Sequence, residues 1–266
     1  MMHAPRPDRM PVLFAGHGSP LNAIEDNAWS RGFRELAAAI PLPRAILSIS
    51  AHWYVPGTFL TADPAPTTIH DFGGFPPALH AVEYGAPGHL DLARDVSRLL
   101  AAHGADLSTR WGLDHGTWSV LKWMYPAADI PVVQLSIDRR LAPRDHFDMA
   151  RSLRDLREQG VLVMGSGNVV HNLRDAFGRM NSGDHATPDW ARRFDAKVAD
   201  ATRQADTATL VALLTDDPDG ALAHPTPDHW LPYLYALGLT DVDDAVRFNS
   251  EGFDLGSLSM RNVIWG

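Results

Sequence analysis

Three histidines follow apolar runs that have the composition of buried β-strands. They are His17 after PVLFA, His52 after AILSI, and His171 after VLVM and the linking segment GSGNVV. The carboxyl ends of parallel strands lie at one edge of an open α/β sheet, where ligands bind. We therefore expect the three imidazoles to lie close together, where they could bind a metal ion or transfer protons.

Glycines stand on both sides of His17, at positions 16 and 18, and occur again at positions 165 and 167 in the segment that leads to His171. They fit a backbone that must turn sharply or let another group approach closely. Neither GHG nor GSG completes a dinucleotide-binding fingerprint, and no P-loop lysine follows. A GxSxG nucleophile elbow is also absent from the sequence, so nicotinamide cofactors and serine hydrolase chemistry are not favoured.

A fourth histidine lies in the late segment HPTPDHWLP. Thr226 is expected to be a helix N-cap with Pro227 in the first helical position, which puts His229 in the first turn. Asp228 stands directly before it. Spacing alone is equally compatible with a helix start that happens to contain histidine.

A fifth histidine, His115 in GLDHGTW, follows Asp114 and precedes Thr117, either of which could cap another helix. We expect its side chain to point into a pocket. The histidines in polar or terminal surroundings are expected at the surface: His3, His89, His103, His146 and His185.

The composition restricts the chemistry. The chain has 266 residues, 13 histidines and no cysteine, so a metal must be held by nitrogen and oxygen, which suits iron, zinc or copper when the nitrogens are imidazoles. The formal charge of −9 without a basic run argues against a nucleic-acid partner. MMHAPRPDRM has no apolar signal region, and no run approaches the roughly 18 apolar residues of a membrane span. We expect a soluble, cytoplasmic protein.

Apolar strand-like runs alternate with helical patterns along the chain. Further strands are expected at 131–137, 245–248 and 257–265, and helices at 27–39, 88–102, 115–124, 143–158, 189–204 and 227–237. This alternation predicts an α/β fold: one domain over residues 1–266, built as a three-layer αβα sandwich around a mostly parallel or mixed sheet. The proline- and glycine-rich segment 63–88 is expected to be an ordered functional loop or lid.

Several motifs together resemble one family. They occur in family order over essentially the whole chain: GHGSP, SAHW, HDFGGFP, GLDHGTW, SGNVVHNL and HPTPDHWLP. The chain is similar to the class III extradiol ring-cleavage dioxygenases, and most similar to their 4,5-DOPA dioxygenase branch. The resemblance implies an α/β domain with a mixed sheet and one mononuclear metal site.

The resemblance also implies roles for the five histidines. His17, His52 and His229 would bind the metal, His171 would act in acid–base catalysis or lie close enough to be a ligand, and His115 would contact the substrate. The wider class usually completes its site with a glutamate, the 2-His-1-carboxylate arrangement. Here His229 takes that place, with Asp228 as a rival ligand. Fe(II) is the expected cofactor, and three imidazoles also suit Zn(II).

The implied activity is the opening of catechols such as L-DOPA with O2, by 4,5-cleavage to seco-DOPA, which cyclises to betalamic acid. The implied partners are a catechol and O2, and the implied assembly is a monomer or homodimer. Aromatic residues beside the motifs could form the pocket walls: Trp53, Tyr54, Phe72, Phe75, Trp118 and Trp230. Arg174 is a candidate for binding a substrate carboxylate. Two alternatives remain, a zinc-dependent hydrolase and a non-catalytic metal-binding protein of the same fold.

Overall fold

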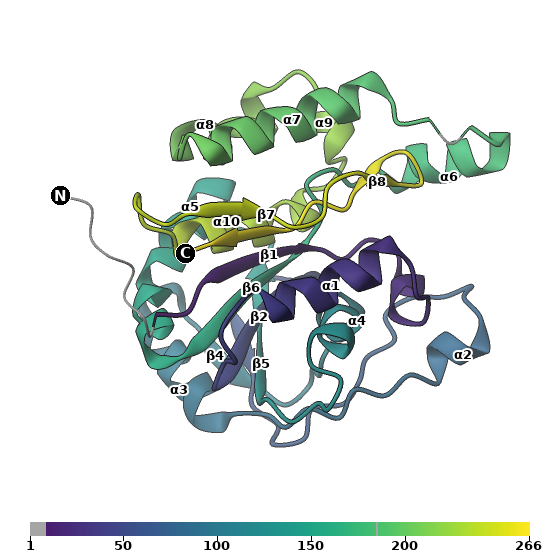
Figure 1. Cartoon of the computed structure of the whole chain (residues 1–266). Helices are drawn as coiled ribbons and strands as arrows, with labels where there is room; N and C mark the ends of the chain where they lie inside the picture. The colour runs from purple at the N-terminus through teal and green to yellow at the C-terminus, as the bar shows by residue number, and fades with distance from the viewer. Residues whose placement is uncertain (1–8, 185) are drawn as a thin grey trace.

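A mixed sheet of eight strands lies between two layers of helices in the computed structural model, which describes residues 9–184 and 186–266 (Figure 1). The strand order is β4-β3-β5-β2-β6-β1-β10-β7. Those strands are β1 (Val12–Gly16), β2 (Ala45–Val55), β3 (Phe59–Thr61), β4 (Asp106–Ser108), β5 (Val132–Asp138), β6 (Val161–Gly167), β7 (Val246–Phe248) and β10 (Val263–Trp265). A separate two-stranded ladder pairs β8 (Phe253–Asp254) with β9 (Leu258–Ser259).

The helices of the described residues cover both faces of this sheet. The α-helices are α1 (Ala28–Ala38), α2 (Pro77–His80), α3 (Leu90–Leu99), α4 (His115–Met124), α5 (Pro143–Ala150), α6 (Leu173–Ser182), α7 (Asp189–Arg203), α8 (Thr207–Asp216), α9 (Gly220–Ala223) and α10 (Leu231–Gly238). Four 3₁₀ helices are η1 (Pro20–Ala23), η2 (Ala101–His103), η3 (Arg151–Gln159) and η4 (Pro227–His229). Among the residues described, no helix has the length and apolar character that crossing a membrane requires.

The centre of the sheet is parallel. Strands β5, β2, β6 and β1 are neighbours that run the same way, whereas β3 and β10 pair antiparallel with β5 and β1. The residues of β1, β5 and β6 are buried throughout, as expected for parallel strands covered on both faces. The carboxyl ends of β2, β6 and β1 therefore lie next to one another at one edge.

Two apolar cores fill the spaces on either side of the sheet. One contains Phe33 and Leu36 from α1 and Trp118 from α4, packed against the sheet residues Leu13 and Ile46. The other contains buried residues of α3, α5, η3, α7, α8 and α10 on the opposite face. Figure 1 shows α1 and α4 on one side of the strands and α5 and α10 on the other. The predicted αβα arrangement around a mixed sheet is confirmed.

Several predicted elements differ in extent. The expected helix at 143–158 is α5 followed by η3, and that at 227–237 is η4 followed by α10. The strand predicted to end at 49 continues to Val55, so His52 lies within β2 instead of after it. Strands β3 and β4, which have only three residues each, and helices α6 and α8 were not predicted.

The expectation for the remaining histidines is partly wrong. His146 is fully buried and its Nδ1 lies 3.1 Å from the hydroxyl of Tyr235, because α5 turns this residue toward α10. His103 is exposed, as predicted. His89 is half-buried and caps α3 through its Nδ1, which accepts a hydrogen bond from Leu92 N at 3.2 Å. His3 and His185 lie outside the described residues.

The glycines of GSG let another segment pass directly over β6. A Cβ on Gly165 would collide with the carbonyl oxygen of Pro232, and one on Gly167 would collide with that of His229. Asn168 N donates to that same carbonyl of His229 at 3.1 Å, and His17 N donates to the carbonyl of Gly167 at the same distance. The absence of side chains at Gly165 and Gly167 thus lets the His229 segment come within hydrogen-bonding distance of the strand ends.

We predict that Gly167→Ala lowers the free energy of unfolding by roughly 1–3 kcal/mol, because the new methyl group has no space against the His229 backbone. Gly178→Ala in α6 is the matched control, since a Cβ there meets nothing within 4 Å. Alanine should favour that helix by up to about 1 kcal/mol. Urea denaturation measures both changes, and a Gly167 variant as stable as the Gly178 variant would contradict the close approach.

Candidate active site

Five histidines meet at the carboxyl edge of the parallel strands. His17 follows β1, His52 lies near the end of β2, His115 begins α4, His171 follows β6 and His229 ends η4. Ring centroids within this cluster are 3.4 to 5.4 Å apart for the pairs in contact. The structure therefore brings together all five histidines that the sequence singled out, from segments more than 200 residues apart.

The imidazole of His17 is oriented by Ser166 of the GSG motif. The Ser166 hydroxyl donates to the carbonyl oxygen of Gly116, and its oxygen lies 2.9 Å from His17 Nδ1. Because the hydroxyl already donates its hydrogen to Gly116, the Ser166 oxygen accepts a hydrogen bond from Nδ1–H of His17. His17 is thus held as the Nδ1–H tautomer, with the lone pair of Nε2 directed into the cluster.

Asp71 orients two further rings from the segment 63–88. Its Oδ2 lies 3.0 Å from Nδ1 of His115 and 3.2 Å from Nδ1 of His52, and its Oδ1 accepts from the backbone N of His115 at 3.0 Å. Burial alone would raise the pKa of Asp71, but hydrogen bonding and charge from His115, and then charge from His52, outweigh it and lower the pKa to about 2. The carboxylate is therefore ionised, accepts a hydrogen bond from Nδ1 of His115, and lies at ion-pair distance from Nδ1 of His52.

His229 is oriented by its neighbour. Nδ1 of His229 lies 3.3 Å from Oδ2 of Asp228, so Asp228 is placed to support His229 from outside the cluster. Nε2 of His229 is buried and has no hydrogen-bond partner among the described residues. A buried nitrogen without a hydrogen-bond partner is costly unless a ligand binds it. Thr226 precedes η4 as expected, although its side chain caps nothing.

His171 stacks on His229 with ring centroids 3.4 Å apart and an interplanar angle of 23°. Among the residues described, neither ring nitrogen of His171 makes a hydrogen bond, and the residue is only half-buried. Its backbone N donates to the carbonyl of Ala223 at 2.9 Å, which fixes the position of the ring beside η4. This imidazole is therefore held by stacking and keeps both nitrogens available.

Burial keeps most of the cluster uncharged. It is the main cause that lowers the pKa of His17, His52 and His229 well below 6.5, with a smaller repulsion from neighbouring imidazoles. Burial also lowers the pKa of His171 to about 3. Neutral imidazoles are the form that binds metal ions.

The donor set fits a metal ion. Nε2 of His17 and Nε2 of His52 are 3.1 Å apart, and with both protons on Nδ1 neither nitrogen can donate to the other. The lone pairs of the two nitrogens therefore face each other and repel. A single cation bonded to both nitrogens, at roughly 2.1 Å from each, would remove this repulsion. Ligand atoms of His17, His52 and His115 lie within 4.8 Å of one another, and the unpartnered Nε2 of His229 lies in the adjoining ring.

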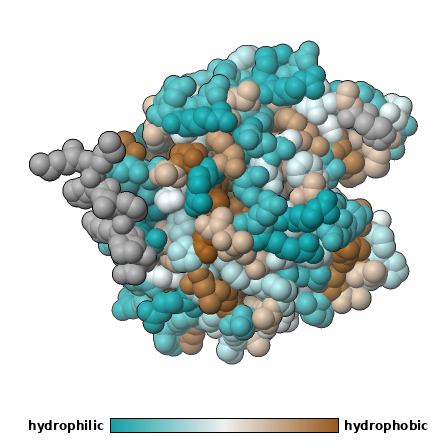
Figure 2. Space-filling model, viewed as in Figure 1, coloured by the Kyte–Doolittle hydropathy of each residue, from teal (hydrophilic) through white to brown (hydrophobic). Residues whose placement is uncertain are grey.

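The surroundings of the cluster are partly aromatic. Phe72 packs edge-on against His115 with centroids 5.5 Å apart, so it lies beside the site. Trp118 and Trp230 are fully buried core residues, and Trp53 stacks on Trp111. In Figure 2 the outline is notched at the end of the molecule where α6 and α2 project in Figure 1. A cavity lies beside the cluster, between α6 on one side and α9 and Pro225 on the other, and none of the five histidines lines it.

Two supporting residues were missed by sequence reasoning. Asp71 lies in the quoted motif HDFGGFP, and Ser166 lies in GSG, yet neither was assigned a role. An acidic residue inside an ordered glycine-rich loop was the available signal for Asp71. Of the two residues that could cap α4, Asp114 is the one that does so, because its side chain accepts a hydrogen bond from Thr117 N at 3.3 Å.

Neutral imidazoles that converge at the carboxyl edge of an α/β sheet define a metal-dependent enzyme site. Residues 12–263 match the family described as the catalytic LigB subunit of aromatic ring-opening dioxygenase. The chain belongs to this LigB family and is an extradiol dioxygenase, a metal-dependent enzyme that uses a small-molecule substrate and O2.

Similar proteins carry the same enzyme name. A protein of Escherichia coli (strain K12) named 4,5-DOPA dioxygenase extradiol is 47% identical, over 96% of this chain and 94% of that protein. One of Beta vulgaris with the same name is 35% identical, over 93% of each. The crystal structure of an uncharacterized protein from Escherichia coli K12 superposes with a TM-score of 0.83 at 41% identity, over 97% of this chain and all of that one.

We predict that the metal-free protein loses stability steeply as pH falls from 7 to 5. His17, His52, His229 and His171 in the cluster, with His224 and His146, have pKa values lowered by burial. Below their ordinary pKa of 6.5 they take up protons only when unfolded, so each removes up to about 1.4 kcal/mol per pH unit. Asp114 acts oppositely, because burial and then repulsion by Asp71 raise its pKa to about 6.

Chemical denaturation at several pH values gives the slope. His146→Gln should reduce the slope by up to about 1.4 kcal/mol per pH unit, because one buried imidazole is removed. His103→Gln should leave it unchanged, since that side chain is exposed in both states. A wild-type stability that is flat between pH 7 and 5 would contradict a cluster of buried neutral histidines.

Proposed function

We propose that this enzyme opens the ring of catechols such as L-DOPA with O2 by 4,5-cleavage, using Fe(II), and that the seco-DOPA product cyclises to betalamic acid. The observation that carries the proposal is the convergence of neutral imidazoles beside the buried Nε2 of His229, which has no hydrogen-bond partner among the described residues. The sequence contains no cysteine that could supply a thiolate instead. The 4,5-DOPA dioxygenase name of the bacterial and plant relatives supports this choice of substrate.

His17, His52 and His229 are the proposed metal ligands. Each has Nδ1 occupied by an acceptor, Ser166, Asp71 or Asp228, and so has its Nε2 lone pair free. Such partners on the outer nitrogen are typical of metal-binding histidines. When bound, the ion supplies positive charge for the two catechol oxygens and a redox centre for O2.

His171 and His115 are the proposed catalytic residues. His171 is unprotonated and has ring nitrogens without hydrogen bonds among the described residues, so it can accept a phenolic proton as the catechol binds. His115 is fixed at Nδ1 by Asp71 and packs against Phe72, which supports a role in contacting the substrate ring. Both residues act on substrate atoms, whereas Asp71 positions them and His52.

The choice between iron and zinc depends on whether the metal ion can change its oxidation state. Three neutral imidazoles suit either ion, but Zn(II) has no redox activity and cannot supply electrons to O2. An O2-dependent ring opening therefore requires iron or another redox-active metal, and we propose Fe(II). Zinc would fill the same ligands and give an inactive enzyme.

We expect the metal-free protein, reconstituted with Fe(II) without air, to consume O2 in step with a yellow ring-opened product when L-DOPA is added. The Zn(II)-loaded protein should consume none, because the ion cannot change oxidation state. An oxygen electrode and the absorbance of the product measure the two quantities. Absence of O2 uptake with L-DOPA and simple catechols, with Fe(II) shown at the site by elemental analysis, would contradict the proposed function.

A second experiment separates ligand from catalytic roles. His229→Ala should lose bound metal, whereas His171→Ala should retain it and turn over roughly 10²–10⁴-fold more slowly, because only proton transfer is removed. His115→Ala should also retain metal. Equilibrium dialysis with elemental analysis measures the metal, and His103→Ala is the control at an exposed position. Metal loss from His171→Ala or His115→Ala, with retention by His229→Ala, would reverse the assignment.

A further inference from the structure

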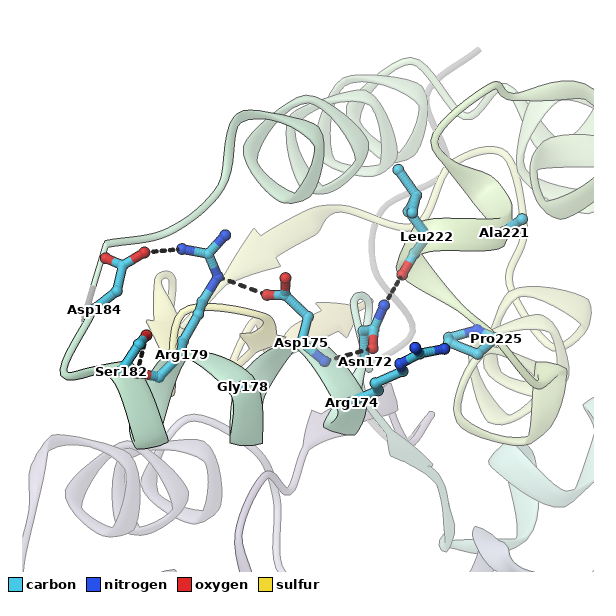
Figure 3. A pocket seen from close by; sticks show the side chains of 10 residues that line it. All are labelled: Asn172, Arg174, Asp175, Gly178, Arg179, Ser182, Asp184, Ala221, Leu222 and Pro225. Atoms are coloured by element: carbon cyan, nitrogen blue, oxygen red, sulfur yellow. Dashed lines mark hydrogen bonds and ion pairs between the residues drawn. The ribbon is translucent and has the colours of Figure 1, made fainter.

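A cavity of about 660 Å³ lies between α6 on one side and α9 and Pro225 on the other. Figure 3 shows its lining, which includes Asn172, Arg174, Asp175 and Arg179 from the α6 side and Leu222 and Pro225 from the other. Both walls are continuous in sequence with segments that carry active-site histidines. Asn172 follows His171, and Pro225 stands four residues before His229, the ring on which His171 stacks.

The first residues of this cavity wall are held in place. Asn172 caps α6 by accepting from Asp175 N at 3.0 Å, and its Nδ2 donates to the carbonyl of Leu222 at 2.8 Å, which ties α6 to α9. The backbone of His171 is tied to Ala223. The position of the cavity relative to His171 is therefore fixed by hydrogen bonds at both walls.

The charges in the cavity are unevenly distributed. Arg179 Nε donates to Asp175 Oδ2 at 2.6 Å and its Nη1 donates to Asp184 Oδ2 at 2.5 Å, so one guanidinium faces two carboxylates. The side chain of Arg174 makes no hydrogen bond or ion pair with the described residues. In Figure 3 its guanidinium lies alongside Pro225, turned away from Arg179 and its two acidic partners.

The end of the cavity nearer to His171 thus carries an uncompensated positive charge, and the farther end carries excess negative charge. An α-amino acid head group has the complementary pair, a carboxylate and an ammonium. A guanidinium binds a carboxylate through two parallel hydrogen bonds, which is the strongest neutralisation available to Arg174. A catechol held at the histidines with a side chain directed along α6 would present its head group to this cavity.

We propose that Arg174 is a specificity-determining residue that binds the carboxylate of the substrate side chain in this cavity. The inference rests on the proposed function, since it requires a catechol at the histidine cluster. It assigns the enzyme to catechols that carry a carboxylate, such as catecholic amino acids, in preference to catechols without one.

Four catechols test this assignment: L-DOPA, 3,4-dihydroxyphenylpropionate, dopamine and 4-methylcatechol. With the Fe(II) enzyme, Arg174→Gln should lower kcat/KM roughly tenfold or more for the first two, which carry a carboxylate. It should change kcat/KM for dopamine and 4-methylcatechol by no more than about twofold, because these lack the group that Arg174 binds. Arg174→Lys, which keeps the charge and loses the planar fork, should be intermediate.

Binding gives a readout that does not depend on turnover. Anaerobic titration calorimetry of the Fe(II) enzyme should give a weaker Kd for L-DOPA in Arg174→Gln and an unchanged Kd for 4-methylcatechol. Arg151→Gln is the matched control, since the side chain of Arg151 is exposed on η3 and makes no hydrogen bond or ion pair with the described residues. It should affect no substrate.

The outcomes distinguish this inference from the proposed function. If the wild-type enzyme opens none of the four catechols, the proposed function fails. If wild type opens them and Arg174→Gln alters all four equally, or none, the proposed function stands and the role of Arg174 is wrong. A selective loss for the two carboxylate-bearing catechols, absent in Arg151→Gln, is the result that supports it.

Discussion

Buried imidazoles in one small volume must remain neutral, and this requirement organises the rest of the site. A second positive charge among rings 3.4 to 5.4 Å apart would be strongly unfavourable without solvent. Each proposed metal ligand therefore keeps its one ring proton on Nδ1 and directs that N–H outward, toward Ser166, Asp71 or Asp228. The lone pairs that remain point inward, and their mutual opposition is relieved when a cation lies between them.

The fold supplies this arrangement through the order of its strands and through the two glycines of β6, Gly165 and Gly167. Strands β2, β6 and β1 are adjacent and parallel, so His52, the segment leading to His171, and His17 meet at one edge. His229 comes from far along the chain and reaches the same place because Gly167 lets its carbonyl contact β6. The loop that carries Asp71 then holds His52 and His115 from outside. A stiff sheet and an ordered loop thus fix donors that no local segment could assemble.

Much of this could be predicted from the sequence because histidines after apolar runs have a definite place in a parallel sheet. The five histidines, the αβα layers and the cap at Asp114 follow from such local signals. Asp71 and Ser166 could not be assigned, because what matters is the ring nitrogen each one contacts, and that depends on tertiary packing. His146 was misjudged for the same reason, since its polar neighbours in sequence lie on the opposite side of α5 from its buried ring. Helix α6 carries apolar residues at helical spacing, Leu173, Phe177 and Met180, but these side chains are exposed and the helix buries only Ala176, while it forms one wall of a cavity.

The central claim is that His17, His52 and His229 present unprotonated Nε2 atoms to one metal ion. A crystal structure of the Fe(II)-loaded protein, with anomalous diffraction measured on both sides of the iron absorption edge, tests it most directly. The account predicts a single iron peak within roughly 2.1 Å of those three Nε2 atoms, with Nδ1 of each still bonded to its acceptor. An iron peak bound to His115 in place of His229, or to any Nδ1 atom of the cluster, would contradict the account.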